Sequence, residues 1–169
     1  MNEPLLQVTD LTKNFRVQGG IVRAVDGVSI SVQAGETLGL VGESGCGKST
    51  LGALMVRLID ADEGRVAFEG RNITNLSRTT LRPIRQHIQI IFQDPFASLN
   101  PRSTVGRTLA EPFLVHRIGT PAERKTWGEE LLRRVGLRPE HASRYPHEFS
   151  GGQRQRVAIA RALALRPKL

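Results

Sequence analysis

The residues Gly42-Glu43-Ser44-Gly45-Cys46-Gly47-Lys48-Ser49 match the spacing G-x-x-x-x-G-K-[ST], which is typical of a phosphate-binding loop. Glycines at these spacings let successive backbone N–H groups point into one hollow that opens onto a helix N-terminus, and such a hollow favours an anion. The Lys48 ammonium would reach the outer phosphates of a nucleotide, and the Ser49 hydroxyl would bind Mg²⁺. The motif predicts a nucleotide site over residues 42–50, with Thr50 as its last member.

The segments on either side of this loop support the prediction. Before it, Thr37-Leu38-Gly39-Leu40-Val41 is an apolar run with the length of a buried parallel strand. After it, Leu51, Leu54, Met55 and Leu58 follow the spacing of one helical stripe. A glycine-rich turn with a surface lysine is the alternative interpretation, and the order of strand, loop and helix argues against it.

Further elements are predicted from periodicity and from turn-forming residues. Short strands are expected at residues 5–8, 28–32, 65–68 and 88–92, and helices within 104–144 and from about 151 to 165. This succession is typical of an α/β P-loop core with a β-rich N-terminal part and an inserted helical subdomain.

The composition is that of an ordinary globular chain, with 169 residues, of which 39% are hydrophobic and 24% charged. No apolar run approaches the ~20 residues of a membrane helix, and residues 1–10 lack the features of a secretory signal. The single cysteine, Cys46, excludes a disulfide framework and is typical of a reducing cytoplasm. Within the loop, Cys46 is either a redox-sensitive thiol at a helix N-terminus or simply a small residue, and we favour the second interpretation.

The net charge of +8 is unevenly distributed along the chain. Residues 1–132 hold 15 basic and 14 acidic residues, whereas residues 133–169 hold 9 basic and 2 acidic ones. A basic stripe can attract phosphates or nucleic acid. We interpret the basic residues of 133–169 as the exposed charged side chains on and around the last predicted helix, and we expect no nucleic-acid partner.

A second motif, Phe149-Ser150-Gly151-Gly152-Gln153, precedes the last predicted helix. On its own it is explained by an S-x-x-Q capping box, in which the side chains of Ser150 and Gln153 bind each other's backbone N–H groups. Its position suggests more, because it follows the phosphate loop by about a hundred residues, with Gln93 between the two.

Together these motifs resemble those of the nucleotide-binding subunits of ABC transporters, over essentially the whole chain. The phosphate loop is similar to their Walker A motif, Gln93 to their Q-loop, and residues 149–153 to their signature motif, with Phe149 where leucine is commoner. The resemblance implies that Phe15 stacks on adenine. It also implies three segments: an N-terminal part of the ATPase core at 1–93, a helical subdomain at 94–150, and a signature helix at 151–169 after which the core sheet is incomplete.

Three longer stretches narrow the resemblance to the ATPases of dipeptide, oligopeptide and nickel importers, namely residues 42–49, 93–102 and 144–153. This implies an ATP-binding and ATP-hydrolysing subunit on the cytoplasmic face of the cell membrane that drives peptide uptake. The implied partners are a second ABC ATPase subunit, transmembrane permease subunits and a separate protein that delivers the peptide.

In this family two ATPase subunits pair head to tail. Each ATP would lie between the Walker A residues of one subunit and the Ser150, Gly151, Gly152 and Gln153 positions of the other. Gln93 would contact Mg²⁺ or the attacking water, so the implied metal contacts are Ser49 and Gln93, and the implied cofactors are ATP and Mg²⁺.

The family's Walker B aspartate, catalytic glutamate and switch histidine follow the point where this sequence ends, and no residue here replaces them. The resemblance therefore implies that these 169 residues alone bind nucleotide weakly at most, without significant hydrolysis. Two other function classes stay open: a soluble ABC ATPase of DNA repair or translation, and a module that binds nucleotide without turnover. The 93–102 stretch and the short helical insert favour the transporter, because repair ATPases carry long coiled coils there.

Overall fold

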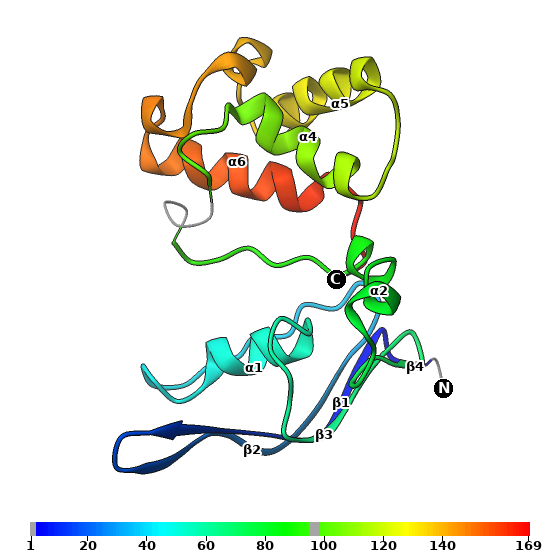
Figure 1. Cartoon of the computed structure of the whole chain (residues 1–169), viewed down its shortest axis with the longest axis vertical. Helices are drawn as coiled ribbons and strands as arrows, with labels where there is room; N and C mark the ends of the chain where they lie inside the picture. Colours follow the sequence, from blue (N-terminus) through cyan, green and yellow to red (C-terminus); the bar gives the residue numbers. More distant parts are fainter. Residues whose placement is uncertain (1–2, 95–98) are drawn as a thin grey trace. The chain divides into compact units, whose positions relative to one another are not determined.

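The computed structural model describes residues 3–94 and 99–169, and the chain forms two compact units, Met1–Leu81 and Arg82–Leu169 (Figure 1). We call them unit 1 and unit 2. Unit 1 holds the strands and the phosphate loop, and unit 2 holds the longer helices. None of the helices in the described residues is long and apolar enough to cross a membrane.

Unit 1 is built on an antiparallel sheet with the strand order β2-β1-β3-β4. Its strands are β1 (Leu6–Val17), β2 (Gly20–Val32), β3 (Glu63–Phe68) and β4 (Arg71–Asn72). The strands predicted at 5–8, 28–32 and 65–68 are thus confirmed, apart from Leu5, which lies just before β1. Alternate apolar residues of β1, such as Leu6 and Val8, are buried, which is the period of a strand with one covered face.

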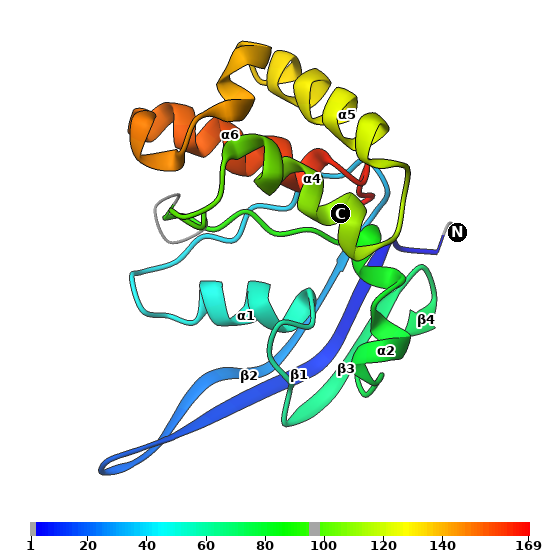
Figure 2. The same ribbon diagram turned by 45° about the horizontal axis from the view of Figure 1, so that its top comes forward.

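The phosphate loop leads into α1 (Lys48–Met55), which lies along one face of this sheet (Figures 1 and 2) and buries Leu51 and Leu54. A short helix, α2 (Arg78–Leu81), ends the unit. The predicted stripe ran on to Leu58, but the helix stops earlier and Leu58 is exposed. The cause is a Schellman turn, in which the Leu58 N–H donates to the Ala53 carbonyl at 2.8 Å and the Arg57 N–H donates to the Leu54 carbonyl at 3.0 Å.

The strands predicted at 37–41 and 88–92 were wrong, because neither segment is assigned as a strand. An apolar run becomes a strand only when a neighbouring strand satisfies its backbone groups. No backbone hydrogen bond links 37–41 to another segment within the described part of the chain. Residues 87–89 exchange two backbone hydrogen bonds with Leu169, from the Leu169 N–H to the His87 carbonyl at 3.0 Å and from the Gln89 N–H to the Leu169 carbonyl at 2.9 Å. Among the described residues, no such bond is found for residues 90–92.

Unit 2 is a small helical bundle, and the predicted helices of this region are confirmed. Its α-helices are α4 (Val105–Val115), α5 (Pro121–Arg134) and α6 (Gly151–Leu163). In the part of unit 2 that the structure describes, short 3-10 helices connect or precede them, namely η1 (Ile84–Gln86), η2 (Pro139–Ser143) and η3 (Pro146–Glu148). The helices share one core, formed by Leu99, Val105, Leu109, Phe113, Leu131, Leu132, Leu137, Phe149, Val157, Ala160 and Ala164.

Candidate nucleotide site

The predicted loop is indeed a turn that ends at the start of α1, with Lys48 as the first helical residue. Gly45 and Gly47 have φ angles of 84° and 94°, a region that side chains other than glycine rarely adopt. A Cβ atom on Gly47 would lie 2.1 Å from the Ala24 carbonyl oxygen, which belongs to β2. The glycine at position 47 is therefore required both by its backbone conformation and by its closeness to β2.

The Lys48 side chain folds back over the loop. Its ammonium donates to the carbonyl oxygens of Gly42 at 2.7 Å and Glu43 at 2.6 Å, and it lies 3.5 Å from the Cys46 sulfur. Because the ammonium is held by neutral carbonyls, its positive charge is available to an anion at the mouth of the loop. Cys46 is exposed, and its sulfur lies beside the Lys48 ammonium. Our interpretation of Cys46 as simply a small residue of the loop stays a prediction.

The N-terminus of α1 differs from those of the three longer helices of unit 2. Side-chain oxygens of Thr104, Thr120 and Ser150 accept backbone N–H groups at the starts of α4, α5 and α6. Gly47 precedes α1 without any side-chain cap, and we find no hydrogen bond to the N–H groups of residues 48–50 among the described residues. Uncapped N–H groups at a helix start are the donors that a phosphate group satisfies.

These features fit the triphosphate of ATP. Uncapped donors, a positive helix end and the Lys48 charge converge on one loop, which also contains Glu43 and Ser44 of the predicted site, while Thr50 lies on the first turn of α1. Ser49 lies on the first turn of α1, where its hydroxyl could bind Mg²⁺. Gln93, the other predicted metal contact, is exposed at a bend in unit 2, so its role stays a prediction. Within residues 3–94 and 99–169 we find no group of three or more His, Cys, Asp or Glu side chains that could hold a metal ion.

Phe15, the residue implied to stack on adenine, lies on β1 and pairs with Val22 of β2. Its ring is 39% exposed, and the Lys13 ammonium lies 5.6 Å from the ring centroid. Lys13 in turn forms a 2.7 Å ion pair with Asp62. The phenylalanine is thus an accessible ring in the same unit as the phosphate loop.

The signature-like residues start α6 in unit 2. The predicted capping box is confirmed, because the Ser150 N–H donates to Gln153 Oε1 at 3.0 Å and the Gln153 N–H donates to Ser150 Oγ at 3.3 Å. Gly151 and Gly152 are exposed, and Phe149 is buried in the core of unit 2. Ser150, Gly152 and Gln153 also line a hollow of about 400 Å³.

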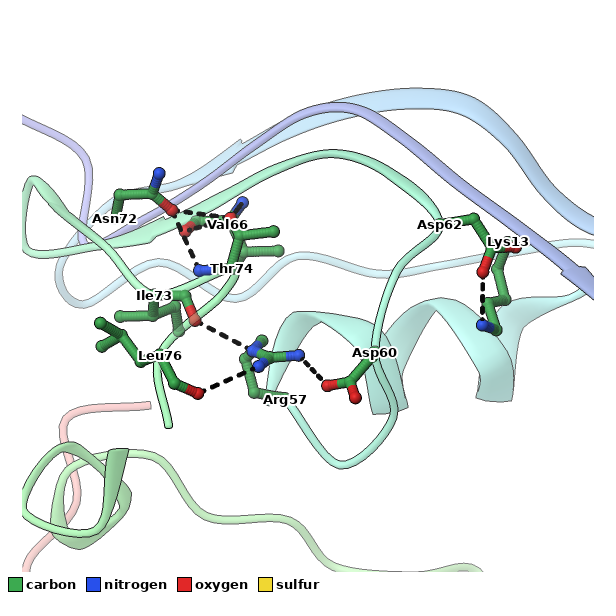
Figure 3. Close-up of polar contacts among 9 residues, drawn as sticks. All are labelled: Lys13, Arg57, Asp60, Asp62, Val66, Asn72, Ile73, Thr74 and Leu76. Carbon is green, nitrogen blue, oxygen red and sulfur yellow. Dashed lines mark hydrogen bonds and ion pairs between the residues drawn. The ribbon is translucent and has the colours of Figure 1, made fainter. Parts of the chain in front are cut away.

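Sequence reasoning missed two charged residues that join separate segments of unit 1. Arg57 is buried at the end of α1, and Asp62 forms an ion pair with Lys13 (Figure 3). The Asp62 carboxylate also accepts the Asn14 N–H. The only hint of a role for Arg57 in the sequence is that it interrupts an apolar run, just before Leu58 and Ile59. Asp62 gave no signal, because its partners lie 48 and 49 residues away along the chain.

Comparison with known proteins gives close relatives. A sequence profile described as ABC transporter matches residues 25–169. The chain is 55% identical to the oligopeptide transport ATP-binding protein AppF of Bacillus subtilis (strain 168), over 99% of this chain and 53% of the relative. It is 52% identical to the glutathione import ATP-binding protein GsiA of Salmonella paratyphi A, over 99% of this chain and 28% of the relative. The chain therefore spans about half, or less, of the length of these relatives.

Solved structures show the same fold. A dimeric post-hydrolysis state of the ATP-binding cassette MJ0796, bound to ADP and Pi, superposes with a TM-score of 0.88 at 32% identity, covering 96% of this chain and 70% of that one. The cbiO1 protein of Clostridium perfringens, part of the transporter complex cbiONQ, gives a TM-score of 0.76 at 29% identity, covering 98% and 63%. With this sequence match and this α/β architecture, the chain belongs to the ABC transporter family and has the fold of its ATPase cassettes.

Proposed function

We propose that this chain is the nucleotide-binding part of an importer subunit that hydrolyses ATP to drive peptide uptake across the cell membrane. The observation that carries the proposal is the uncapped N-terminus of α1 beneath a loop that holds the Lys48 ammonium. The names of two relatives, an oligopeptide transport and a glutathione import ATP-binding protein, support the transport role.

The individual site residues have distinct roles in this proposal. The loop residues 42–50 bind the phosphates, and Phe15 stacks on the adenine ring. Ser49 and Gln93 hold Mg²⁺, which would neutralise charge on the phosphates when bound. The segment 150–153 contacts an ATP held by a second ATPase subunit, as the dimeric state of the related cassette MJ0796 supports.

The proposed assembly places the subunit at the cytoplasmic face of the membrane, bound to permease subunits that receive the peptide from a separate binding protein. Catalysis in such a site is positioning plus electrostatic stabilisation of the transferred phosphoryl group. The chain's own contribution is to hold the phosphates against the α1 N-terminus and to keep the Lys48 charge beside them.

Two measurements test the proposal. The first is equilibrium binding of ATP to the purified 169-residue chain, in which CMP and inorganic phosphate should compete more weakly than unlabelled ATP. The second is uptake of a labelled tripeptide and of labelled glutathione by cells from which the gene for this protein has been deleted. ATP binding together with loss of peptide uptake is the expected result, and normal uptake of both substrates would contradict the transport role.

A further inference from the structure

The C-terminal end of α1 is tied to the rest of unit 1 by a buried arginine. Arg57 is 8% exposed, and its guanidinium donates to the Ile73 carbonyl through Nε at 2.9 Å and to the Leu76 carbonyl through Nη2 at 3.5 Å. Nη1 pairs with the Asp60 carboxylate, whose side chain is 86% exposed. Figure 3 shows the side chain pointing from the end of α1 toward these carbonyl groups.

The segment that receives Arg57 is itself fastened to the sheet. The Ile73 N–H donates to the Val66 carbonyl of β3 at 2.9 Å. The Thr74 hydroxyl accepts the Val66 N–H at 2.8 Å and contacts the Val66 carbonyl at 3.3 Å. A chain of hydrogen bonds therefore runs from the end of α1 through Arg57 to β3.

We propose that Arg57 is a positioning residue for the phosphate loop, because it fixes one end of the helix whose other end carries that loop. The inference rests on the nucleotide site proposed above. An eight-residue helix is about 12 Å long, so a tilt of about 10° about the Arg57 end would move the loop end by about 2 Å. Displacements of this size are enough to spoil the alignment of phosphate donors.

Arg57 stands at a backbone position that usually favours glycine. Arg57 has a φ of 57°, at the place in a Schellman turn where glycine is favoured. Arg117 occupies the same place after α4, with a φ of 58° and the matching bonds from its own N–H to Leu114 and from Ile118 to Phe113. Arg117 is exposed, so it offers the same backbone geometry without a buried guanidinium.

Because Arg57 and Arg117 share one backbone geometry, they can be compared directly in the full chain. The variants are Arg57→Gly, Arg57→Lys and Arg117→Gly. Glycine suits the backbone at both sites, so a difference between the two glycine variants reports the side chain. The first readout is hydrogen exchange of the amides of residues 43–51 without nucleotide. The second is the ATP dissociation constant, measured where circular dichroism shows each variant folded.

We expect Arg57→Gly to speed exchange in the loop several-fold and to weaken ATP binding about tenfold, because part of the binding free energy must then be spent on ordering the loop. Arg57→Lys keeps a positive charge but lacks the planar fork of the guanidinium, so both of its readouts should lie between those of Arg57→Gly and of the unaltered chain. The lysine variant also tests the proposal if the glycine variant fails to fold. Arg117→Gly should change neither readout. Equal effects at Arg57 and Arg117, or a lower melting temperature for Arg57→Gly with unchanged loop exchange, would overturn the proposal.

Absence of ATP binding by the unaltered chain would count against the proposed nucleotide site on residues 42–50. In that case the hydrogen-exchange comparison still decides whether Arg57 positions the loop, because it needs no nucleotide.

Discussion

The ammonium of Lys48 lies 2.7 Å from the carbonyl oxygen of Gly42, the first residue of the loop that precedes it. A second bond, to the Glu43 carbonyl at 2.6 Å, closes the loop around the lysine side chain. Lys48 therefore braces the loop, and a bound phosphate would compete with these two carbonyls for the ammonium N–H groups.

Replacing Lys48 with alanine should weaken ATP binding by about tenfold to a hundredfold, because hydrogen bonds to a charged group contribute about 1.5–3 kcal/mol. Lys125→Ala, at an exposed position on α5, is the control and should bind ATP normally. Isothermal titration with ATP provides the measurement. Equal affinity for the two variants would remove Lys48 from the site.

The two loop glycines should respond differently to alanine. Gly45→Ala meets open space and suffers only from its φ of 84°, whereas Gly47→Ala also places a Cβ 2.1 Å from the Ala24 carbonyl. The first should lower the free energy of unfolding by about 1 kcal/mol and the second by clearly more. Urea unfolding of both variants gives the comparison, and similar losses would argue against the close approach of the loop to β2.

An aromatic ring at position 15 should strengthen the binding of ATP by stacking on its adenine base. Phe15→Ala should weaken ATP binding by about 1–3 kcal/mol, and Phe15→Trp should retain it, because stacking needs only a planar ring. Ile21, which pairs with Arg16 and is 67% exposed, offers a control in Ile21→Ala. Comparing ATP with inorganic triphosphate isolates the base, since triphosphate affinity should be the same for all four proteins.

Ser150 should stabilise α6 as its cap. Ser150→Ala should lower the free energy of unfolding by about 0.5–2 kcal/mol, whereas Ser150→Asn should preserve most of it, since asparagine is also a good cap. Thr104→Ala removes the cap of α4 and should cost a similar amount. Denaturant unfolding measures all three, and an unaffected Ser150→Ala variant would show that the capping box contributes nothing.

Acid should weaken unit 1 through Asp62. The pKa of Asp62 is lowered by its hydrogen bond from Lys13 and by that from the Asn14 N–H. A lowered pKa means that the unfolded chain takes up the proton first, so the stabilisation is present above the ordinary aspartate pKa of about 3.9 and is lost as the pH falls below it.

The check is urea unfolding between pH 3 and pH 6. Asp62→Asn should flatten the pH dependence relative to the unaltered chain, and Asp26→Asn, which removes an exposed aspartate of β2, should leave it in place. A pH dependence that survives in Asp62→Asn would assign the acid sensitivity to other groups.

The helices of unit 2 could be predicted closely because their signals are local. The caps of α5 at Thr120 and of α6 at Ser150 each involve residues within one helical turn, and the box predicted for Ser150 and Gln153 forms as expected. The end of α1 was predicted three residues too late, at Leu58, because the apolar spacing continues past the Schellman turn. The left-handed backbone of Arg57 ends the helix there, and arginine is not a residue that predicts such a turn.

The sequence alone was enough to predict the turn before Lys48, the helix that follows it and the family, because each depends on residues close together in the chain. Tertiary structure decided the rest. The apolar segments 37–41 and 88–92 are not strands, since a strand needs a partner along its length, and among the described residues only Gln89 of these segments has a backbone bond to another segment. Arg57 and Asp62 gain their importance from carbonyl, N–H and ammonium groups brought to them by the fold. Contacts of this kind join residues distant along the chain, so spacing alone could not predict them.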